Sequence, residues 1–307
     1  DLTGVDLTGV TSGNINGFSA SLGSYSIING YLIGPGVDLT GADLAGANLY
    51  GVSSGAITGT PVLPAGYVIV NGYLVGAGVN LTGADLTSAT TGINKLTNMD
   101  LTDAVLIGAS LNEASLVGVR LINAVLTNAD LTDCYMGWAK LNNADLTGAN
   151  LTGADLAGAD LAGAILTGAN LTGVSGKIDG TPTLPANYSI ITGSSSDSYI
   201  AGPGVDLTGA NLIGANLDGV DLTDVDLSGL DLSGVSSYGL TGTPTLPNGY
   251  NIMSGYLVGP NVNLTGTDLA GANLTGADLT GADLTGALLS GVTGTITGTP
   301  SSMPQGY

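Results

Sequence analysis

The chain has 307 residues, 52 of them Gly, and its 24 acidic residues against four Lys and Arg give a formal net charge of −20. This balance argues against nucleic-acid binding, because neutralising phosphates requires clustered Lys and Arg. With no His and only Cys134, an internal disulfide and the usual pairings of nucleophile and base are excluded, so we do not expect an enzyme. No run of 18 apolar residues occurs, so we expect no membrane span.

Leucine recurs every fifth residue in five separate runs along the chain. The first run is short and is centred on Leu2 and Leu7, whereas the longest extends from Leu81 to Leu171 with only Thr91 and Met136 departing from Leu. A small residue stands two places before most of these positions, Asp or Asn one place before, and Thr-Gly often follows. The runs cover residues 1–10, 37–51, 79–173, 205–234 and 262–291.

A period of five fits neither regular element. In a helix the Leu positions would sweep around every side, and in a plain strand they would alternate between faces because five is odd. Gly and Asp or Asn in every unit also disfavour a long helix. The pattern therefore predicts a chain that bends once per unit, with the small residue and Leu pointing inward and Thr-Gly at the corner, so that successive turns stack into a solenoid.

The tracts 144–148, 149–153 and 154–158 read Ala-Asp-Leu-Thr-Gly, Ala-Asn-Leu-Thr-Gly and Ala-Asp-Leu-Ala-Gly. They resemble the repeat of the pentapeptide-repeat family over about half of the chain. The resemblance implies an all-β fold, a right-handed four-sided parallel β-helix with four units per coil and a core of Leu. We expect one continuous solenoid over residues 1–307. The resemblance is specific for fold and says little about function, because the family has several unrelated roles.

The segments between the runs repeat among themselves. The tract 59–67, Gly-Thr-Pro-Val-Leu-Pro-Ala-Gly-Tyr, recurs with small changes at 242–250, and a Tyr-rich stretch with Asn-Gly or Ser-Gly at its centre follows. The spacing between the flanking runs is constant except in one copy, which inserts residues at Ser194–Ser198. Asn-Gly between β-prone halves predicts a tight hairpin, although two sides of an irregular coil bent at Gly remain an alternative. The segments are 11–36, 52–78, 174–204, 235–261 and 292–307.

In a coil of twenty residues, positions twenty apart lie above one another. The slot before Leu then gives two informative ladders: Asn80, Asp100, Arg120, Lys140 and Asp160, and Asp85, Val105, Val125, Asp145 and Ile165. Arg120, Tyr135, Trp138 and Lys140 form a possible contact patch, or else the charges only compensate neighbouring carboxylates and the rings only cover a side. We expect no cofactor and no specific metal site, but diffuse binding of divalent cations is compatible with the charge. Cys134 takes the place of the small residue and is expected to be buried.

These features favour a structural, non-enzymatic building block of an extracellular or cell-surface filament. The pattern of the intervening segments, Gly-Thr-Pro-x-Leu-Pro-x-Gly-Tyr followed by Gly-Tyr-Leu-Val-Gly-Pro-Gly, resembles the long secreted or surface type of the family. Neither end shows a capping helix, and Asp1 implies a processed form or a piece of a longer chain, so we expect head-to-tail stacking of copies or of adjacent repeats of a longer chain. The expected end-stacking residues are Leu2, Leu7 and Tyr307.

Two other functions remain open. The acidic charge also suits a DNA mimic that binds a topoisomerase, as in pentapeptide-repeat gyrase-protecting proteins. The outward Thr ladder suits ice binding, although its neighbours are mixed. That ladder comprises Thr127, Thr147 and Thr167.

Overall fold

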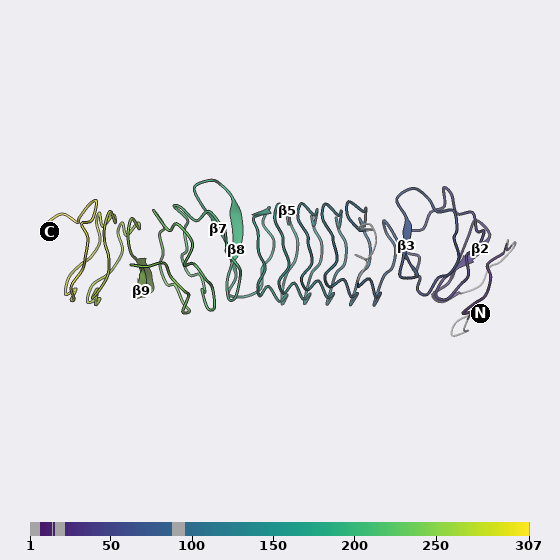
Figure 1. Ribbon diagram of the computed structural model, residues 1–307, viewed down its shortest axis with the longest axis horizontal. Coiled ribbons are helices and arrows are strands. Elements are labelled where there is room, and N and C mark those ends of the chain that lie inside the picture. The colour runs from purple at the N-terminus through teal and green to yellow at the C-terminus, as the bar shows by residue number, and fades with distance from the viewer. Residues whose placement is uncertain (1–6, 14, 16–21, 88–95, 307) are drawn as a thin grey trace. The chain divides into compact units, whose positions relative to one another are not determined.

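The computed structural model describes residues 7–13, 15, 22–87 and 96–306 (Figure 1). All regular secondary structure in these residues is β, and none of them forms a helix that is long and apolar enough to cross a membrane. The chain divides into two compact units, each considered by itself below. The first unit is Asp1–Asn170 with Gly180–Pro185, and the second is Leu171–Asp179 with Ala186–Tyr307. A single solenoid over residues 1–307 stays a prediction.

Coils of twenty residues build the long run of the first unit. Parallel bridges join Asp100 to Arg120, and equivalent bridges start at every fifth residue that follows, so four units complete each coil. Each bridge carries two backbone hydrogen bonds: Leu101 N–H donates to the Arg120 carbonyl at 2.7 Å, and Arg120 N–H donates to the Met99 carbonyl at 2.9 Å. The stacked coils precede β5 (Ala159–Asp160) in Figure 1. The five-residue period thus predicts the register from Asp100 to Asn170 correctly.

Leu and the small residue before it fill the interior of these coils. Leu101, Leu121 and Leu141 are each at most 1% exposed, and Val119 and Ala139, which stand two places before the last two, are fully buried. Because bridged slots lie above one another, the adjacent Leu side chains form a column along the stack. Burying one Leu stabilises the fold by about 1.5–3 kcal/mol, so a core without aromatic residues suffices when it is repeated in every unit.

The corner residue, two places after Leu, adopts a positive φ. Gly148 has φ 68°, and Asn123 and Trp138 both have φ 56°. Gly reaches this region without a steric penalty, and Asn and Asp tolerate it better than most residues, which explains why they dominate the corner. Trp138 is an exception to that preference.

The ladders at the start of the long run differ from the expected ones. Asn80 bridges Val105 and Asp85 bridges Ser110, both 25 residues apart, instead of Asp100 and Val105. The coil from Asp85 to Ser110 therefore contains five residues more than a regular coil. Thr91, which takes the place of Leu in the sequence, lies outside the described residues.

Four antiparallel hairpins occupy the intervening segments, as Asn-Gly and its stand-ins predict. At two tips Asn29-Gly30 and Asn71-Gly72 have positive φ at both residues, the geometry of a type I′ turn that matches the twist of the strands. Ser254-Gly255 repeats it in the last hairpin. The alternative of an irregular coil is therefore wrong. The pairs are β1 (Ser26–Ile28) with β2 (Tyr31–Ile33), β3 (Val68–Val70) with β4 (Tyr73–Val75), β7 (Ser189–Thr192) with β8 (Ser198–Ala201), and β9 (Asn251–Met253) with β10 (Tyr256–Val258). In the second unit β6 (Ile178–Asp179) also pairs with β8.

A tyrosine fastens every hairpin to the point where the chain re-enters the coil. Tyr67 Oη donates to the Ala77 carbonyl at 2.8 Å, and its ring lies where a Cβ on Gly76 would stand. Only Gly fits under the ring, which accounts for the Gly that ends each hairpin. The equivalent hydrogen bonds run from Tyr25 to Pro35, from Tyr188 to Pro203 and from Tyr250 to Pro260.

Candidate functional site

The Asp and Asn side chains that stand directly before Leu form hydrogen bonds within the coil. Asp145 Oδ1 accepts the Thr147 N–H at 2.9 Å, and Asn150 Oδ1 accepts the Thr152 N–H at 3.3 Å, so each side chain closes an Asx turn at its own corner. The Thr147 hydroxyl and N–H lower the pKa of the Asp145 carboxyl, and the Thr87 hydroxyl and N–H do the same for Asp85. Much of the negative charge is thus part of the architecture.

Arg120 and Lys140 lie on one ladder, as predicted, whereas Lys95 lies outside the described residues. Asp100, Arg120, Lys140 and Asp160 bridge in series. Arg120 Nε lies 3.7 Å from Asp100 Oδ2, and Lys140 Nζ lies 3.7 Å from Asp160 Oδ2. About half of each basic side chain is exposed, so each pair contributes about 1 kcal/mol or less. This ladder carries both signs of charge on one side of the coil.

The aromatic members of the predicted patch lie elsewhere on the coil. Tyr135 belongs to the neighbouring ladder, and Trp138 stands at the corner with its ring against Gly158. They are 59% and 68% exposed. Among the described residues no hydrogen bond, ion pair or ring contact joins them to Arg120 or Lys140. The four residues as one contact patch therefore stay a prediction.

An open groove of about 550 Å³ lies beside Tyr135. Cys134 forms part of its floor, but the residue is only 1% exposed and its thiol donates to the Leu111 carbonyl at 3.0 Å. Burial raises the pKa of this thiol to about 12, so it is buried as predicted and chemically inert. Within the described residues no three His, Cys, Asp or Glu side chains are placed to hold a metal ion. The other lining residues are Glu113, Asp133, Gly153 and Asp155.

The other predicted sites are dispersed. Leu7 N–H donates to Tyr25 Oη at 3.4 Å, whereas Leu2 and Tyr307 lie outside the described residues. In the Thr ladder, Thr127 Oγ1 donates to Asp145 Oδ2 at 3.4 Å, and Thr127 is only partly exposed. The same column contains Ile107, so the Thr ladder is short and partly engaged with the coil.

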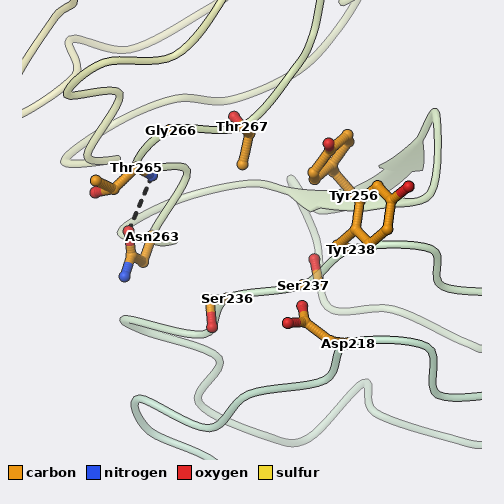
Figure 2. A pocket seen from close by; sticks show the side chains of 9 residues that line it. All are labelled: Asp218, Ser236, Ser237, Tyr238, Tyr256, Asn263, Thr265, Gly266 and Thr267. Atoms are coloured by element: carbon orange, nitrogen blue, oxygen red, sulfur yellow. Dashed lines mark hydrogen bonds between the residues drawn. The ribbon is translucent and has the colours of Figure 1, made fainter.

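The structure contains recesses that the sequence analysis missed. One lies beside the tip of the β9–β10 hairpin, has a volume of about 270 Å³ and includes Tyr238 and Tyr256 (Figure 2). A smaller one, about 180 Å³, lies beside the tip of the β7–β8 hairpin next to Tyr199 and Lys177. The available signal was Tyr238 itself, because the corresponding position in an earlier segment is Gly55.

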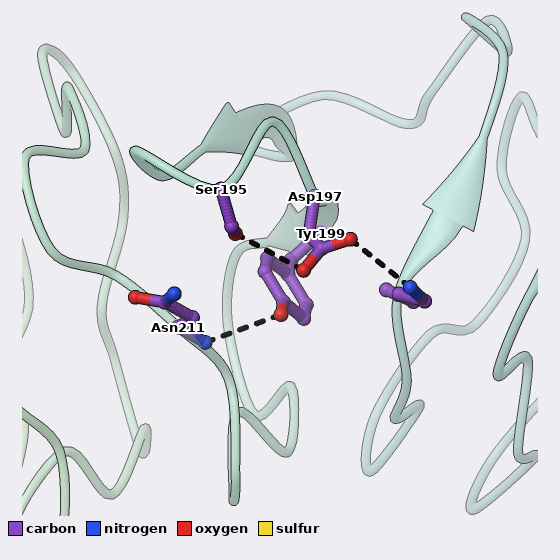
Figure 3. Close-up of polar contacts among 5 residues, drawn as sticks. Ser195, Asp197, Tyr199 and Asn211 are labelled. Atoms are coloured by element: carbon purple, nitrogen blue, oxygen red, sulfur yellow. Dashed lines mark hydrogen bonds and ion pairs between the residues drawn. The ribbon is translucent and has the colours of Figure 1, made fainter.

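Polar contacts tie the inserted hairpin tip of the second unit to the coil. Lys177 Nζ lies 3.0 Å from Asp197 Oδ1, and Ser195 Oγ donates to Asp197 Oδ2 at 3.0 Å (Figure 3). The hydrogen bond and charge of Asp197 raise the pKa of Lys177. Asn211 N–H donates to Tyr199 Oη at 3.1 Å. Lys177 therefore has a structural partner.

Comparison with known proteins identifies the repeat. The profile described as Pentapeptide repeats matches eight copies, in residues 100–137, 139–175, 204–236 and 261–293. No curated protein matches the chain.

Three solved pentapeptide repeat proteins are similar. HetL from the cyanobacterium Nostoc sp. strain PCC 7120, involved in heterocyst differentiation regulation, is 23% identical over 86% of this chain and 85% of its own, with a TM-score of 0.26. Rfr23 from the cyanobacterium Cyanothece 51142 is 31% identical over 34% of this chain and 87% of its own, with a TM-score of 0.29. A protein from the thylakoid lumen of Arabidopsis thaliana is 31% identical over 31% of this chain and 67% of its own, with a TM-score of 0.23. The chain belongs to the pentapeptide repeat family, whose members fold as right-handed quadrilateral β-helices.

Proposed function

We propose that the protein is a non-enzymatic structural building block of an extracellular or cell-surface filament, in which coils of one copy stack on coils of the next or on further repeats of a longer chain. The observation that supports this proposal is the coil edge at residues 293–303 of the second unit, which can pair with a coil of another copy or of a longer chain. Leu274 N–H donates to the Thr293 carbonyl at 2.8 Å, and Leu279 N–H donates to the Thr297 carbonyl at 2.9 Å. These bonds satisfy one side of the coil.

The other side of that coil has donors and acceptors without backbone partners among the described residues. The regular pattern would have Gly294, Gly298 and Met303 donate their N–H groups to a following coil. An unpaired row of this kind is a template for another chain with the same spacing. A coil of another copy with the same backbone geometry would pair with this edge.

The chemistry of the surface agrees with a structural role. Slot carboxylates such as Asp145 are engaged in Asx turns, and the Cys134 thiol is buried and protonated. Pentapeptide repeat proteins are generally structural or binding proteins. Labelling of intact cells with a membrane-impermeant reagent tests the extracellular location. If the proposal is right, the protein is labelled before the cells are lysed.

Electron microscopy of the purified full chain tests end-to-end stacking. We expect filaments, and we expect Met303→Pro to shorten or abolish them, because proline removes an N–H on the open edge. Met303→Ala keeps that N–H and should leave the filaments unchanged. Both variants should melt at the wild-type temperature. Discrete particles of the wild-type chain, or filaments unaffected by Met303→Pro, would overturn the proposal.

A second candidate is a DNA mimic that binds a topoisomerase, which the formal net charge of −20 favours. Stacked carboxylates imitate the spacing of charge along a duplex only in part, because Arg120 and Lys140 interrupt one ladder. A supercoiling assay with DNA gyrase is the test, and undiminished supercoiling at an excess of the protein would remove this function. Absence of thermal hysteresis would likewise remove ice binding.

A further inference from the structure

The recess beside the tip of the β9–β10 hairpin occurs where one coil is longer than the others. Asn263 N–H donates to the Val235 carbonyl at 2.9 Å, so Asn263 occupies the place above Ser236 after 27 residues instead of twenty. The longer coil includes the hairpin, and the recess of about 270 Å³ lies between Tyr256 near the hairpin tip and the coil residues Asn263–Thr267 (Figure 2). The fold therefore opens a hollow on the surface of the second unit.

An aromatic pair forms one wall of this hollow. The rings of Tyr238 and Tyr256 have centroids 5.8 Å apart and an interplanar angle of 55°. Tyr256 is 6% exposed, and its Oη accepts the Asp268 N–H at 3.3 Å, so it is fixed in the fold. Tyr238 is 64% exposed. The fixed ring holds the exposed one beside the recess.

Polar groups with unused hydrogen-bonding capacity surround the exposed ring. Among the described residues, the Asp218 carboxylate and the Ser236 hydroxyl have no hydrogen-bond partner. Asn263 Oδ1 accepts the Thr265 N–H at 3.0 Å, which leaves its amide N–H₂ group available (Figure 2). The recess thus offers a charged acceptor, a hydroxyl and an amide donor next to one aromatic face.

The same unit contains a second, similar recess. Comparing the two shows which residues the fold requires and which only line the recess. At the β7–β8 hairpin, Tyr199 takes the place of Tyr256, and its Oη also accepts an N–H twelve residues later, from Asn211. Lys177 stands there in the position of Tyr238 and is engaged with Asp197. The buried tyrosine is therefore common to both hairpins, whereas the exposed residue changes. The fold does not require an aromatic ring at Tyr238.

We propose that the recess beside Tyr238 binds one ring of a neutral oligosaccharide. The C–H face of a sugar ring would stack on the electron-rich face of Tyr238, and its hydroxyl groups would donate to the Asp218 carboxylate and accept from the Asn263 amide. A volume of 270 Å³ falls just below the range of about 300–1,000 Å³ typical of drug-sized pockets, which suits a single ring.

The charge and composition of the recess narrow the ligand class. The formal net charge of −20 disfavours anionic saccharides. Asp218 is the only carboxylate among the lining residues, whereas Ca²⁺ takes six to eight oxygen ligands, so a cation is not the preferred ligand. The remaining lining is hydroxyl, amide and Gly, which is too polar for an apolar ligand.

Calorimetric titration of the full chain with neutral oligosaccharides of glucose, galactose, mannose and N-acetylglucosamine tests the proposal. We expect at least one to bind, with affinity reduced tenfold or more by Tyr238→Ala and severalfold by Asp218→Asn. Tyr135→Ala removes a similarly exposed ring from the first unit and should change nothing. All three variants should retain the wild-type melting temperature, because these side chains are exposed.

Two results would overturn the saccharide proposal: no binding by any of these sugars, or binding that Tyr238→Ala leaves intact. Preferential binding of a neutral peptide at the same residues would also contradict it. The proposal does not depend on filament formation. Micrographs of the Tyr238→Ala variant distinguish the saccharide proposal from the filament proposal. If the variant loses sugar binding but still forms filaments, the two properties are independent.

Discussion

Shortening Leu121 to Ala tests the column of leucines in the first unit. Leu121 is 1% exposed, and bridges place its unit between those of Leu101 and Leu141. The substitution removes three buried carbon atoms. Each buried methylene contributes about 0.8 kcal/mol to the free energy of unfolding. The cavity left between two neighbouring coils adds to this loss, so we expect a total of about 3–5 kcal/mol, within the range of buried Leu→Ala changes.

Urea unfolding followed by fluorescence measures this effect where it occurs. Trp138 is the only Trp of the chain and lies in the coil next to Leu121, so its emission reports on this stack. Val125→Ala is the matched control, because Val125 belongs to the same coil but is only partly buried, and it should cost less than about 1 kcal/mol. Equal shifts in the urea midpoint for Leu121→Ala and Val125→Ala would refute the buried column.

Three further predictions concern the stability of one hairpin, the reactivity of the Cys134 thiol and the loss of stability at acid pH. Gly76→Ala should destabilise the β3–β4 hairpin by about 1–3 kcal/mol, because its methyl group would overlap the Tyr67 ring, whereas Gly229→Ala, which meets open space, should leave the melting temperature nearly unchanged. Cys134 should resist alkylation at pH 8 until urea unfolds the chain, and rapid labelling of the folded protein would contradict its burial. The pKa of Asp145 is lowered in the fold, so its stabilising contribution is present above the unfolded pKa of about 3.9 and is lost as pH falls further. Asp145→Asn keeps the acceptor without titrating, and its melting temperature should fall less between pH 5 and pH 2 than that of the wild type; identical profiles would contradict this.

The coil and the hairpins could be predicted because their causes are local. Each unit carries its own inward pair and its own corner, so five residues specify one side without reference to distant sequence. Asn71-Gly72 likewise specifies a type I′ turn by itself. The ladder from Asp100 to Asp160 followed directly from counting twenty residues per coil.

The register before Asp100 could not be counted in the same way. Periodicity alone assumes that every unit forms one side of a coil, and Thr91 was the only departure from Leu near the shift. Trp138 shows a similar limit, because its spacing after Met136 places it at the corner, but only the fold shows that its ring rests on Gly158.

The recess also depends on long-range geometry. Tyr238 acquires its role only because the β9–β10 hairpin brings Tyr256 against it and Asn263 returns beside Ser236. None of these neighbours is adjacent to Tyr238 in sequence. The comparison with Gly55 in an earlier segment singles out the residue, but only the folded chain shows what surrounds it.

Engineered disulfides test the stacking of the coils most directly. Adjacent strands lie about 4.8 Å apart, within the range of about 4.4–6.8 Å between Cα atoms that a disulfide spans. Asn80→Cys with Val105→Cys should form a cross-link under mild oxidation, because these residues bridge, whereas Asn80→Cys with Asp100→Cys should not. Mass spectrometry of peptides from the oxidised chains distinguishes the two. Cross-linking of the second pair in preference to the first would contradict the coil register on which the account rests.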